Sequence, residues 1–400
     1  YVPAPHSIYK GIKKLEPGTI LTVSLNHHSL ERYWDAREVA KRGFESPFNI
    51  PVNEVRNNLE EALKKTISQQ MMADVPLGAF LSGGIDSSAV VALMQAQSPR
   101  AIKTFTIGFK EAGYNEAEFA KTVAEHLGTE HTELYVSPKD ALDVVPNLPS
   151  LYCEPFADSS QIPTFLVSAL ARQNVTVSLS GDGGDELFCG YNRYLFTDKL
   201  WKGLKITPTA LRKLVGETVQ SLPDAGWRRT FEFLNTITPS KFNGVILGDK
   251  LKKGAGVVAS KDLISLYKGL VSNWQDPSMV VIGDGEHSKI FSSDIKMLSN
   301  MSDIEKMMAI DVVSYLPDDI LVKVDRAAMG VSLETRVPFL DHNIIEFASK
   351  IPLSMKLNKG VGKAVLRDIL YRYVPRKLIE RPKMGFGIPM AEWLKGPLKE

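Results

Sequence analysis

The sequence has 400 residues, of which 44% are hydrophobic and 24% are charged. This composition is typical of a folded globular protein, and the length predicts one large domain or two closely packed ones. The 48 basic and 46 acidic side chains leave a net charge of +2, which excludes a broad cationic surface for nucleic acid.

Cysteine content and hydropathy indicate the compartment. Cys153 and Cys189 are far apart in the sequence, so we interpret both as free thiols in a reducing compartment. Neither lies in a CxxC pair that would predict a zinc site. No apolar run approaches the roughly 18 residues of a membrane span, and no signal-like leader is visible. We therefore expect a cytoplasmic protein.

The first part of the chain predicts short strands and turns. Residues 1–35 contain several prolines, the apolar run ILTVSL and a closing RYWD. We interpret residues 1–50 as a connector from an N-terminal domain that precedes Tyr1. A helix is expected to follow from Val52, because apolar residues then recur at helical spacing.

Strands and helices alternate through residues 51–200. Strands are predicted at 77–81, 103–109, 133–136 and 175–180, and helices at 115–128 and 161–172. This alternation predicts an α/β fold, a Rossmann-like parallel sheet flanked by helices. Ligands of such sheets bind at the carboxyl ends of the strands.

The second half of the chain carries less strand signal. Residues 201–300 show little periodicity, and we interpret them as a mostly helical insertion. Residues 301–400 predict a mainly helical C-terminal region.

A polar, glycine-rich loop follows the first predicted strand. Residues 80–94 read FLSGGIDSSAVVALM, a strand end, a turn and the start of a helix. Backbone N–H groups at such a junction bind anions, and Gly83 and Gly84 permit close approach. Hydroxyl donors suited to phosphate oxygens come from Ser82, Ser87 and Ser88. Since Asp86 cannot bind phosphate directly, we expect it to hold a cation.

A second loop, SGDGGDELF, follows the strand at 175–180. It brings together Asp182, Asp185 and Glu186, and crowded carboxylates require a cation or a proton between them. If the two strands are neighbours, Asp185 can face Asp86. Two carboxylates and phosphate oxygens would then suit Mg²⁺.

These motifs resemble a known family. LSGGIDSS looks like the pyrophosphate-binding loop of the ATP pyrophosphatases, which have the adenine nucleotide alpha hydrolase-like fold. The whole chain is similar to the synthetase half of glutamine-dependent asparagine synthetases. Further motifs of the resemblance are FTIGF, SLSGDGGDELFCGY, LPDDILVKVDRAAMGVSLETRVPFLDH, GVGKAVLRDIL and RPKMGFGIP.

The resemblance implies roles for individual residues. It implies Asp86 and Asp185 as the magnesium carboxylates, and Lys383 as the lysine at the reacting phosphoryl group. It also implies an adenosine site bordered by four residues, which are Leu81, Ile107, Ser180 and Gly181.

Three further positions leave alternatives open. Asp182 stands where asparagine synthetases have glutamate, and we keep it as a candidate base for the attacking ammonia, although it is one methylene shorter. Tyr191 is expected to line the acceptor side or to be a core tyrosine. Lys363, at the start of a helix, is expected to meet pyrophosphate or to lie on the surface.

Another group of charged residues has two interpretations. Substrate binding and a structural ion-pair cluster are equally compatible with the pattern of Asp325, Arg326, Glu334 and Arg336.

The expected reaction is asparagine synthesis from aspartate, ATP and ammonia with Mg²⁺, releasing AMP and pyrophosphate. The resemblance implies a glutaminase domain as the partner that supplies ammonia, and a homodimer is a further expectation. Rivals are synthetases acting on another carboxylate, namely β-lactam synthetases, lasso-peptide cyclases and polysaccharide-cluster amidotransferases. A tRNA-modifying ATP pyrophosphatase and an inactive binding module are more remote.

Overall fold

The computed structural model of the chain describes residues 1–111, 115–212, 214, 218, 258–272, 297–380 and 388–399. The chain divides into two compact units. The first unit combines Tyr1–Tyr191 with Met308–Glu400, and the second is Asn192–Met307. All the loops predicted to bind ligand between residues 80 and 191 belong to the first unit.

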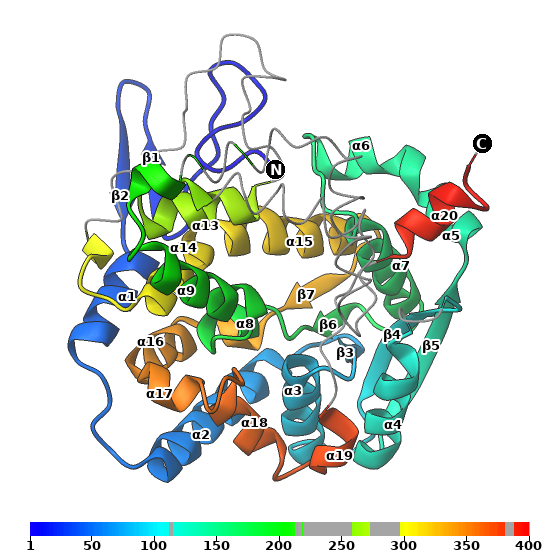
Figure 1. The fold of residues 1–400 in the computed structure, drawn as a ribbon. Helices are drawn as coiled ribbons and strands as arrows, with labels where there is room; N and C mark the ends of the chain where they lie inside the picture. Colours follow the sequence, from blue (N-terminus) through cyan, green and yellow to red (C-terminus); the bar gives the residue numbers. More distant parts are fainter. Residues whose placement is uncertain are drawn as a thin grey trace, which may run out of the picture. The chain divides into compact units, whose positions relative to one another are not determined.

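A parallel sheet forms the centre of the first unit (Figure 1). Among the described residues it has five strands in the order β5-β4-β3-β6-β7, and every neighbouring pair is parallel. The strands are β3 (Leu77–Phe80), β4 (Lys103–Phe109), β5 (Glu130–Val136), β6 (Val177–Leu179) and β7 (Glu334–Arg336). The α/β fold class predicted from the sequence is therefore confirmed.

The order of the strands reverses between β3 and β6. From β3 the chain moves outward through α3 (Ile85–Ala96) to β4 and through α4 (Ala117–Leu127) to β5. It then returns through α7 (Gln161–Arg172) to β6 on the other side of β3. The loops after β3 and β6 therefore flank a topological switch point, where sheets of this kind bind ligands.

Helices cover both faces of the sheet with two apolar clusters. One cluster joins α3 and α4 to α2 (Val52–Gln70), α16 (His342–Lys350) and α18 (Ala364–Leu370). The other joins α7 to α5 (Pro138–Val144), α15 (Leu321–Met329) and α20 (Met390–Lys395). Six of the seven residues of β4 and all three of β6 are buried, as expected for strands that are covered on both faces.

Local sequence explains the ends of several elements. In α2, Val55, Leu59 and Leu63 are fully buried at helical spacing, as predicted. α4 ends at Gly128, whose φ of 71° is the left-handed conformation that glycine adopts at helix C-termini. The predicted bounds of α7 and β4 agree with the structure.

Shorter elements complete the description. β1 (Thr19–Val23) and β2 (His28–Arg32) form an antiparallel hairpin. The described part of the first unit also contains the helices α1 (Ala36–Glu45), α6 (Leu148–Tyr152), α8 (Gly184–Leu187), α17 (Leu353–Lys356) and α19 (Arg376–Ile379). It has 3-10 turns at η1 (Val145–Asn147) and η6 (Pro338–Leu340) and a π-helix at η5 (Leu316–Ile320). The second unit contains α9 (Asn192–Leu204) and α13 (Leu263–Val271), and α14 (Asp303–Val313) crosses its boundary.

The C-terminal region is mainly helical as expected, but it also supplies β7, an edge strand that the sequence did not predict. Most of the predicted insertion at 201–300 lies outside the described residues, and the boundaries at 50, 200 and 300 stay predictions. No helix in the described parts of the chain combines the length and the apolar character needed to span a membrane.

Candidate active site

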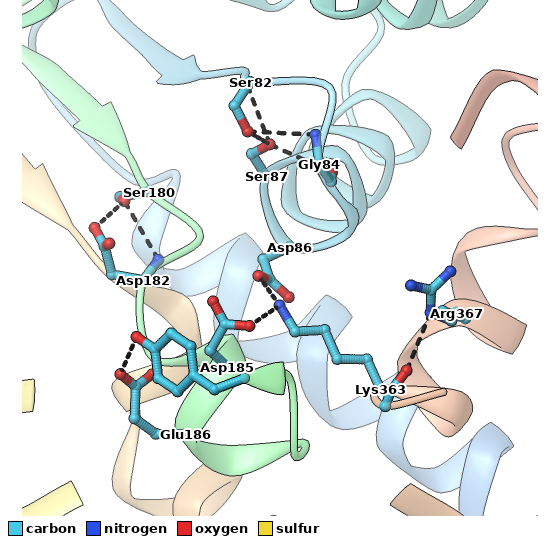
Figure 2. A network of polar contacts seen from close by, with 12 residues as sticks. Ser82, Gly84, Asp86, Ser87, Ser180, Asp182, Asp185, Glu186, Lys363 and Arg367 are labelled. Atoms are coloured by element: carbon cyan, nitrogen blue, oxygen red, sulfur yellow. Dashed lines mark hydrogen bonds and ion pairs between the residues drawn. The ribbon is translucent and has the colours of Figure 1, made fainter. Parts of the chain in front are cut away.

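The loop after β3 is closed by its own serine hydroxyls. The Ser82 and Ser87 hydroxyls lie 3.0 Å apart, and the Ser82 N–H donates to Ser87 Oγ at 3.1 Å (Figure 2). The Gly84 N–H donates to Ser82 Oγ at 3.3 Å. Gly83 has a φ of 70°, and a Cβ there would lie 2.8 Å from the Ala120 nitrogen. Only glycine fits this turn, which leads directly into the N-terminus of α3.

Three of the predicted nucleotide-binding residues lie deep in the fold. Ser88 is fully buried, and its hydroxyl has no hydrogen-bond partner among the described residues. Leu81 and Ile107 are buried in the two apolar clusters on opposite faces of the sheet. Their side chains are therefore committed to the core, and their predicted contact with adenosine stays a prediction that involves main-chain atoms.

The loop after β6 packs directly against the loop after β3. The Ser180 N–H donates to the Arg336 carbonyl of β7 at 2.8 Å, which fixes the start of this loop. A Cβ on Gly181 would lie 2.7 Å from the Ser87 nitrogen, and a Cβ on Gly184 would lie 2.5 Å from Asp86 Oδ1. The glycines of the second motif thus bring the two loops into van der Waals contact.

The carboxylates of Asp86 and Asp185 meet at one ammonium group, that of Lys363 (Figure 2). Lys363 Nζ lies 2.7 Å from Asp185 Oδ1 and forms an ion pair with Asp86 Oδ2. The structure therefore brings together the two predicted magnesium carboxylates, and also the predicted pyrophosphate lysine. Lys363 is buried, so the alternative of a surface lysine is wrong.

An unusual backbone conformation positions Lys363. Its φ of 59° is left-handed, and its N–H donates to the Phe188 carbonyl at 2.8 Å. Next to it, a Cβ on Gly362 would lie 1.9 Å from the Cys189 carbonyl oxygen. Cys189 is itself left-handed, with a φ of 59°. Strained non-glycine residues of this kind persist only where the surrounding contacts hold them.

The two carboxylates keep the Lys363 side chain positively charged. Burial lowers the pKa of the Lys363 ammonium, but Asp86 and Asp185 outweigh burial, so the pKa stays above its ordinary value. Two carboxylates that converge on one cation fit Mg²⁺, which in proteins uses one or two carboxylates together with substrate phosphates. Among the described residues, no group of three or more acidic, cysteine or histidine side chains forms a fuller metal cage.

Asp182 lies beside Ser180 in the second loop. The Ser180 hydroxyl donates to Asp182 Oδ2 at 2.5 Å (Figure 2). Burial raises the pKa of the Asp182 carboxyl, while Ser180 and the Lys323 ammonium oppose this effect. The carboxylate therefore folds back on its own loop. Its predicted role as a base stays a prediction.

Tyr191 follows the second loop and contacts Glu186. The Tyr191 hydroxyl donates to Glu186 Oε1 at 2.7 Å, and its ring lies edge-on to Tyr315 with 6.1 Å between the centroids. Burial raises the pKa of the Glu186 carboxyl to about 7. The tyrosine is thus part of a buried polar contact next to Asp185, which is compatible with both predicted interpretations.

The remaining predicted residues are of three kinds: one lies outside the described residues, two form a structural ion pair and two are exposed. Lys383 lies outside the described residues. Arg336 pairs with Glu334 at 2.6 Å and donates to the Gln70 carbonyl at 2.7 Å, so these two form the structural cluster that was one of the alternatives. Asp325 and Arg326 are exposed on α15.

A second ion pair, which no sequence pattern predicted, joins α15 to the segment before α7. Lys323 on α15 is buried, and its Nζ lies 2.8 Å from Asp158 Oδ2. The Ser160 hydroxyl also donates to Asp158, at 2.7 Å. The Asp158 charge also raises the pKa of the neighbouring Asp319 carboxyl, after the larger effect of burial. The only signal in the sequence was a lysine within the apolar run LVKV, which is weak without its partner.

The chain is similar to known proteins over nearly its whole length. The family model described as asparagine synthase matches residues 58–400. An asparagine synthetase (glutamine-hydrolyzing) of Bacillus subtilis is 32% identical over 100% of this chain, and a putative one of Mycobacterium tuberculosis is 31% identical over 99%. An amidase of Penicillium rubens is 23% identical over 98% of the chain.

The matches cover nearly all of this chain but only part of each relative. The chain spans 59% of the length of the Bacillus protein and 57% of the Mycobacterium protein. The matched part includes both loops, the converging carboxylates and Lys363. Since the family model and two relatives above 30% identity cover most of the chain, the chain belongs to the asparagine synthase family.

Proposed function

We propose that this chain catalyses ATP-dependent synthesis of asparagine from aspartate and ammonia through a β-aspartyl-adenylate. The observation that carries the proposal is the convergence of Asp86 and Asp185 on the Lys363 ammonium at the sheet's switch point. A phosphate-binding turn beside two carboxylates suits a substrate that loses pyrophosphate as its magnesium complex. The relatives named asparagine synthetase support the choice of product.

The first proposed step joins aspartate to the nucleotide. A side-chain carboxylate oxygen of aspartate attacks the α-phosphorus of ATP, and the bond from that phosphorus to the bridging oxygen breaks. Pyrophosphate departs with the electron pair, and aspartyl-adenylate remains. The proposed donors to the developing phosphate charge are the N-terminus of α3 and the Ser82 and Ser87 hydroxyls, which lie together in the loop before this helix.

Magnesium would be held by Asp86 and Asp185 and, when bound, would neutralise charge on the phosphate oxygens. The proposed role of this chain is to orient the two phosphate groups against the loop at Gly83 and Gly84. Lys363 would remain beside the leaving group and would keep its positive charge there.

The second proposed step transfers the acyl group to nitrogen. Ammonia attacks the carbonyl carbon of the adenylate, AMP leaves, and the nitrogen loses one proton. Asp182 is the proposed proton acceptor, because its carboxylate lies in the loop that also carries Asp185. The relatives' names include glutamine hydrolysis, and we propose a glutaminase domain as the source of ammonia in the longer protein.

Incubation with ATP, Mg²⁺, ammonia and a panel of carboxylic acids tests this function. The expected result is aspartate-dependent formation of AMP and pyrophosphate, together with asparagine. Glutamine should replace ammonia only if a glutaminase domain is present. Formation of ADP and phosphate instead of AMP would contradict the proposal.

A second candidate is amide formation on a different carboxylate. It is favoured by Asp182, which is shorter than the glutamate at this place in asparagine synthetases and hydrogen bonds to Ser180. The same panel of acids separates the two candidates, because only the true substrate stimulates exchange of labelled pyrophosphate into ATP.

A further inference from the structure

The Lys363 ammonium occupies the position that a divalent cation would need. Both Asp86 and Asp185 reach it, and the lysine is buried among them (Figure 2). A metal ion held by the same two carboxylates would compete with this ammonium directly. Displacing a buried, doubly paired lysine costs free energy, because its charge must find a new partner.

The new partner for the lysine is present only when nucleotide is bound. Pyrophosphate brings several negative charges to the loop that lies beside Asp86, and an ammonium on a flexible stem can turn toward them. A free divalent ion brings no such anion. The cost of moving Lys363 is therefore offset only when metal and phosphate arrive together.

From this arrangement we propose that Lys363 is a built-in competitor of the metal, which keeps free Mg²⁺ out of the site and admits it only as its complex with a nucleotide or pyrophosphate. The inference rests on the proposed function, because it assigns Asp86 and Asp185 to the metal. It makes Lys363 a positioning residue that determines which form of the cation binds.

The fold holds the backbone of Lys363 while leaving its side chain able to move. Arg367 Nε donates to the Gly362 carbonyl at 3.1 Å, and the Lys363 N–H is bonded to Phe188. These contacts fix the main chain at the start of α18. The Nζ contacts of Lys363 in Figure 2 are ion pairs to carboxylates. The competition thus needs only a side-chain rotation.

Direct titration with Mn²⁺ in the absence of nucleotide tests the proposal, with the free ion measured by electron paramagnetic resonance. The wild-type protein should bind Mn²⁺ weakly. Lys363→Met should bind it at least about tenfold more tightly, since two carboxylates are released. Adding Asp185→Asn to Lys363→Met should abolish the gain, which assigns the new site to this pair.

Two variants control for charge and for the loss of a lysine. Lys363→Arg keeps a cation between the carboxylates and should leave Mn²⁺ affinity at the wild-type level. Lys64→Met removes a lysine paired with Glu60, which keeps Arg372 as a second partner. This variant should also leave the affinity unchanged.

Either of two results would overturn the proposal. One is tight, Asp185-dependent binding of Mn²⁺ to the wild-type protein without nucleotide, which is informative even if Lys363→Met fails to fold. The other is a folded Lys363→Met that gains no affinity. Both leave aspartate-dependent AMP formation untouched, so the competitor proposal can fail while the proposed function stands.

Discussion

The charges around Lys363 alternate in sign over three side chains. Asp86 and Asp185 contribute two negative charges to the one positive charge of the lysine. The group therefore keeps a net negative charge inside the fold, which is costly unless a further cation or a hydrogen-bond donor approaches. This excess of negative charge supports the proposal that the switch point of the sheet binds a metal complex.

Only part of this residue-level arrangement was predictable. The meeting of Asp86 and Asp185 followed from two motifs at the ends of strands that proved to be neighbours. The bond from Ser180 to Asp182 depends on the conformation of one turn, which no residue pattern specifies. Lys363 comes from more than 170 positions later in the sequence, and its left-handed backbone had no local signal.

Asp319 predicts a pH dependence of stability. Burial and the neighbouring Asp158 raise its pKa to about 7 in the folded protein, compared with an ordinary value of 3.8 for an aspartate carboxyl. Between these values the folded state binds more protons than the unfolded state. The free energy of unfolding should therefore fall as pH rises from about 4 to about 7.

Replacing Asp319 by asparagine should remove this contribution. Asp319→Asn can donate permanently to Asp158, so its urea unfolding curve should change less between pH 4 and pH 8 than that of the wild type. After allowance for screening at this half-buried site, the difference should be about 1 kcal/mol. Equal pH dependence in the two proteins would contradict the assignment.

Substitution of Tyr191 distinguishes a structural role of this side chain from a role in substrate binding. Tyr191→Phe leaves the buried Glu186 without its 2.7 Å donor, which should lower the free energy of unfolding by about 1–3 kcal/mol. If the tyrosine is also on the acceptor side, KM for the carboxylic acid should rise at a temperature where the variant is folded. A variant as stable as the wild type would rule out the buried contact.

At the scale of elements, the two loops depend on glycine at their contact. A Cβ on Gly181 would lie 2.7 Å from the Ser87 nitrogen, a backbone atom that cannot rotate away. Gly203, in contrast, has no atom within 4 Å of a Cβ. These two glycines therefore form a matched pair for testing the contact.

Gly181→Ala should push the second loop away from α3. We expect a loss of about 1–3 kcal/mol in the free energy of unfolding, as for other overpacked sites, and a large loss of pyrophosphate exchange. Gly203→Ala, on α9, should be neutral or slightly stabilising. Thermal unfolding and exchange assays check both variants. An active Gly181→Ala of normal stability would contradict the close packing of the loops.

Long apolar strands were predicted more accurately than short strands or strand ends that are defined by pairing with a neighbour. β4 was predicted at 103–109 because KTFTIGF forms a short apolar run, and the structure has the same bounds. β5 begins at Glu130, three residues before its predicted start, because pairing with Lys103 rather than apolar character defines its first residues. β7 has only three residues, all polar, at the edge of the sheet, so periodicity could not reveal it.

At the scale of the whole molecule, the sheet brings segments that are distant in sequence together at the carboxyl ends of its strands. The strand order β5-β4-β3-β6-β7 brings the loops after β3 and β6 together, and α18 then adds Lys363 from the C-terminal region. Sequence alternation predicted the sheet but not the position of α18. Packing of apolar faces, with Val365 and Leu366 fully buried against the first cluster, determines that position.

A double-mutant cycle on pyrophosphate exchange tests the central claim that Asp86 and Asp185 act on one cation. Aspartate-dependent exchange is measured for Asp86→Asn, Asp185→Asn and the variant with both changes. Each single change should cost at least about a hundredfold, and the double change should cost little more than either single one. Losses that multiply, or a single variant with full exchange, would contradict a shared cation.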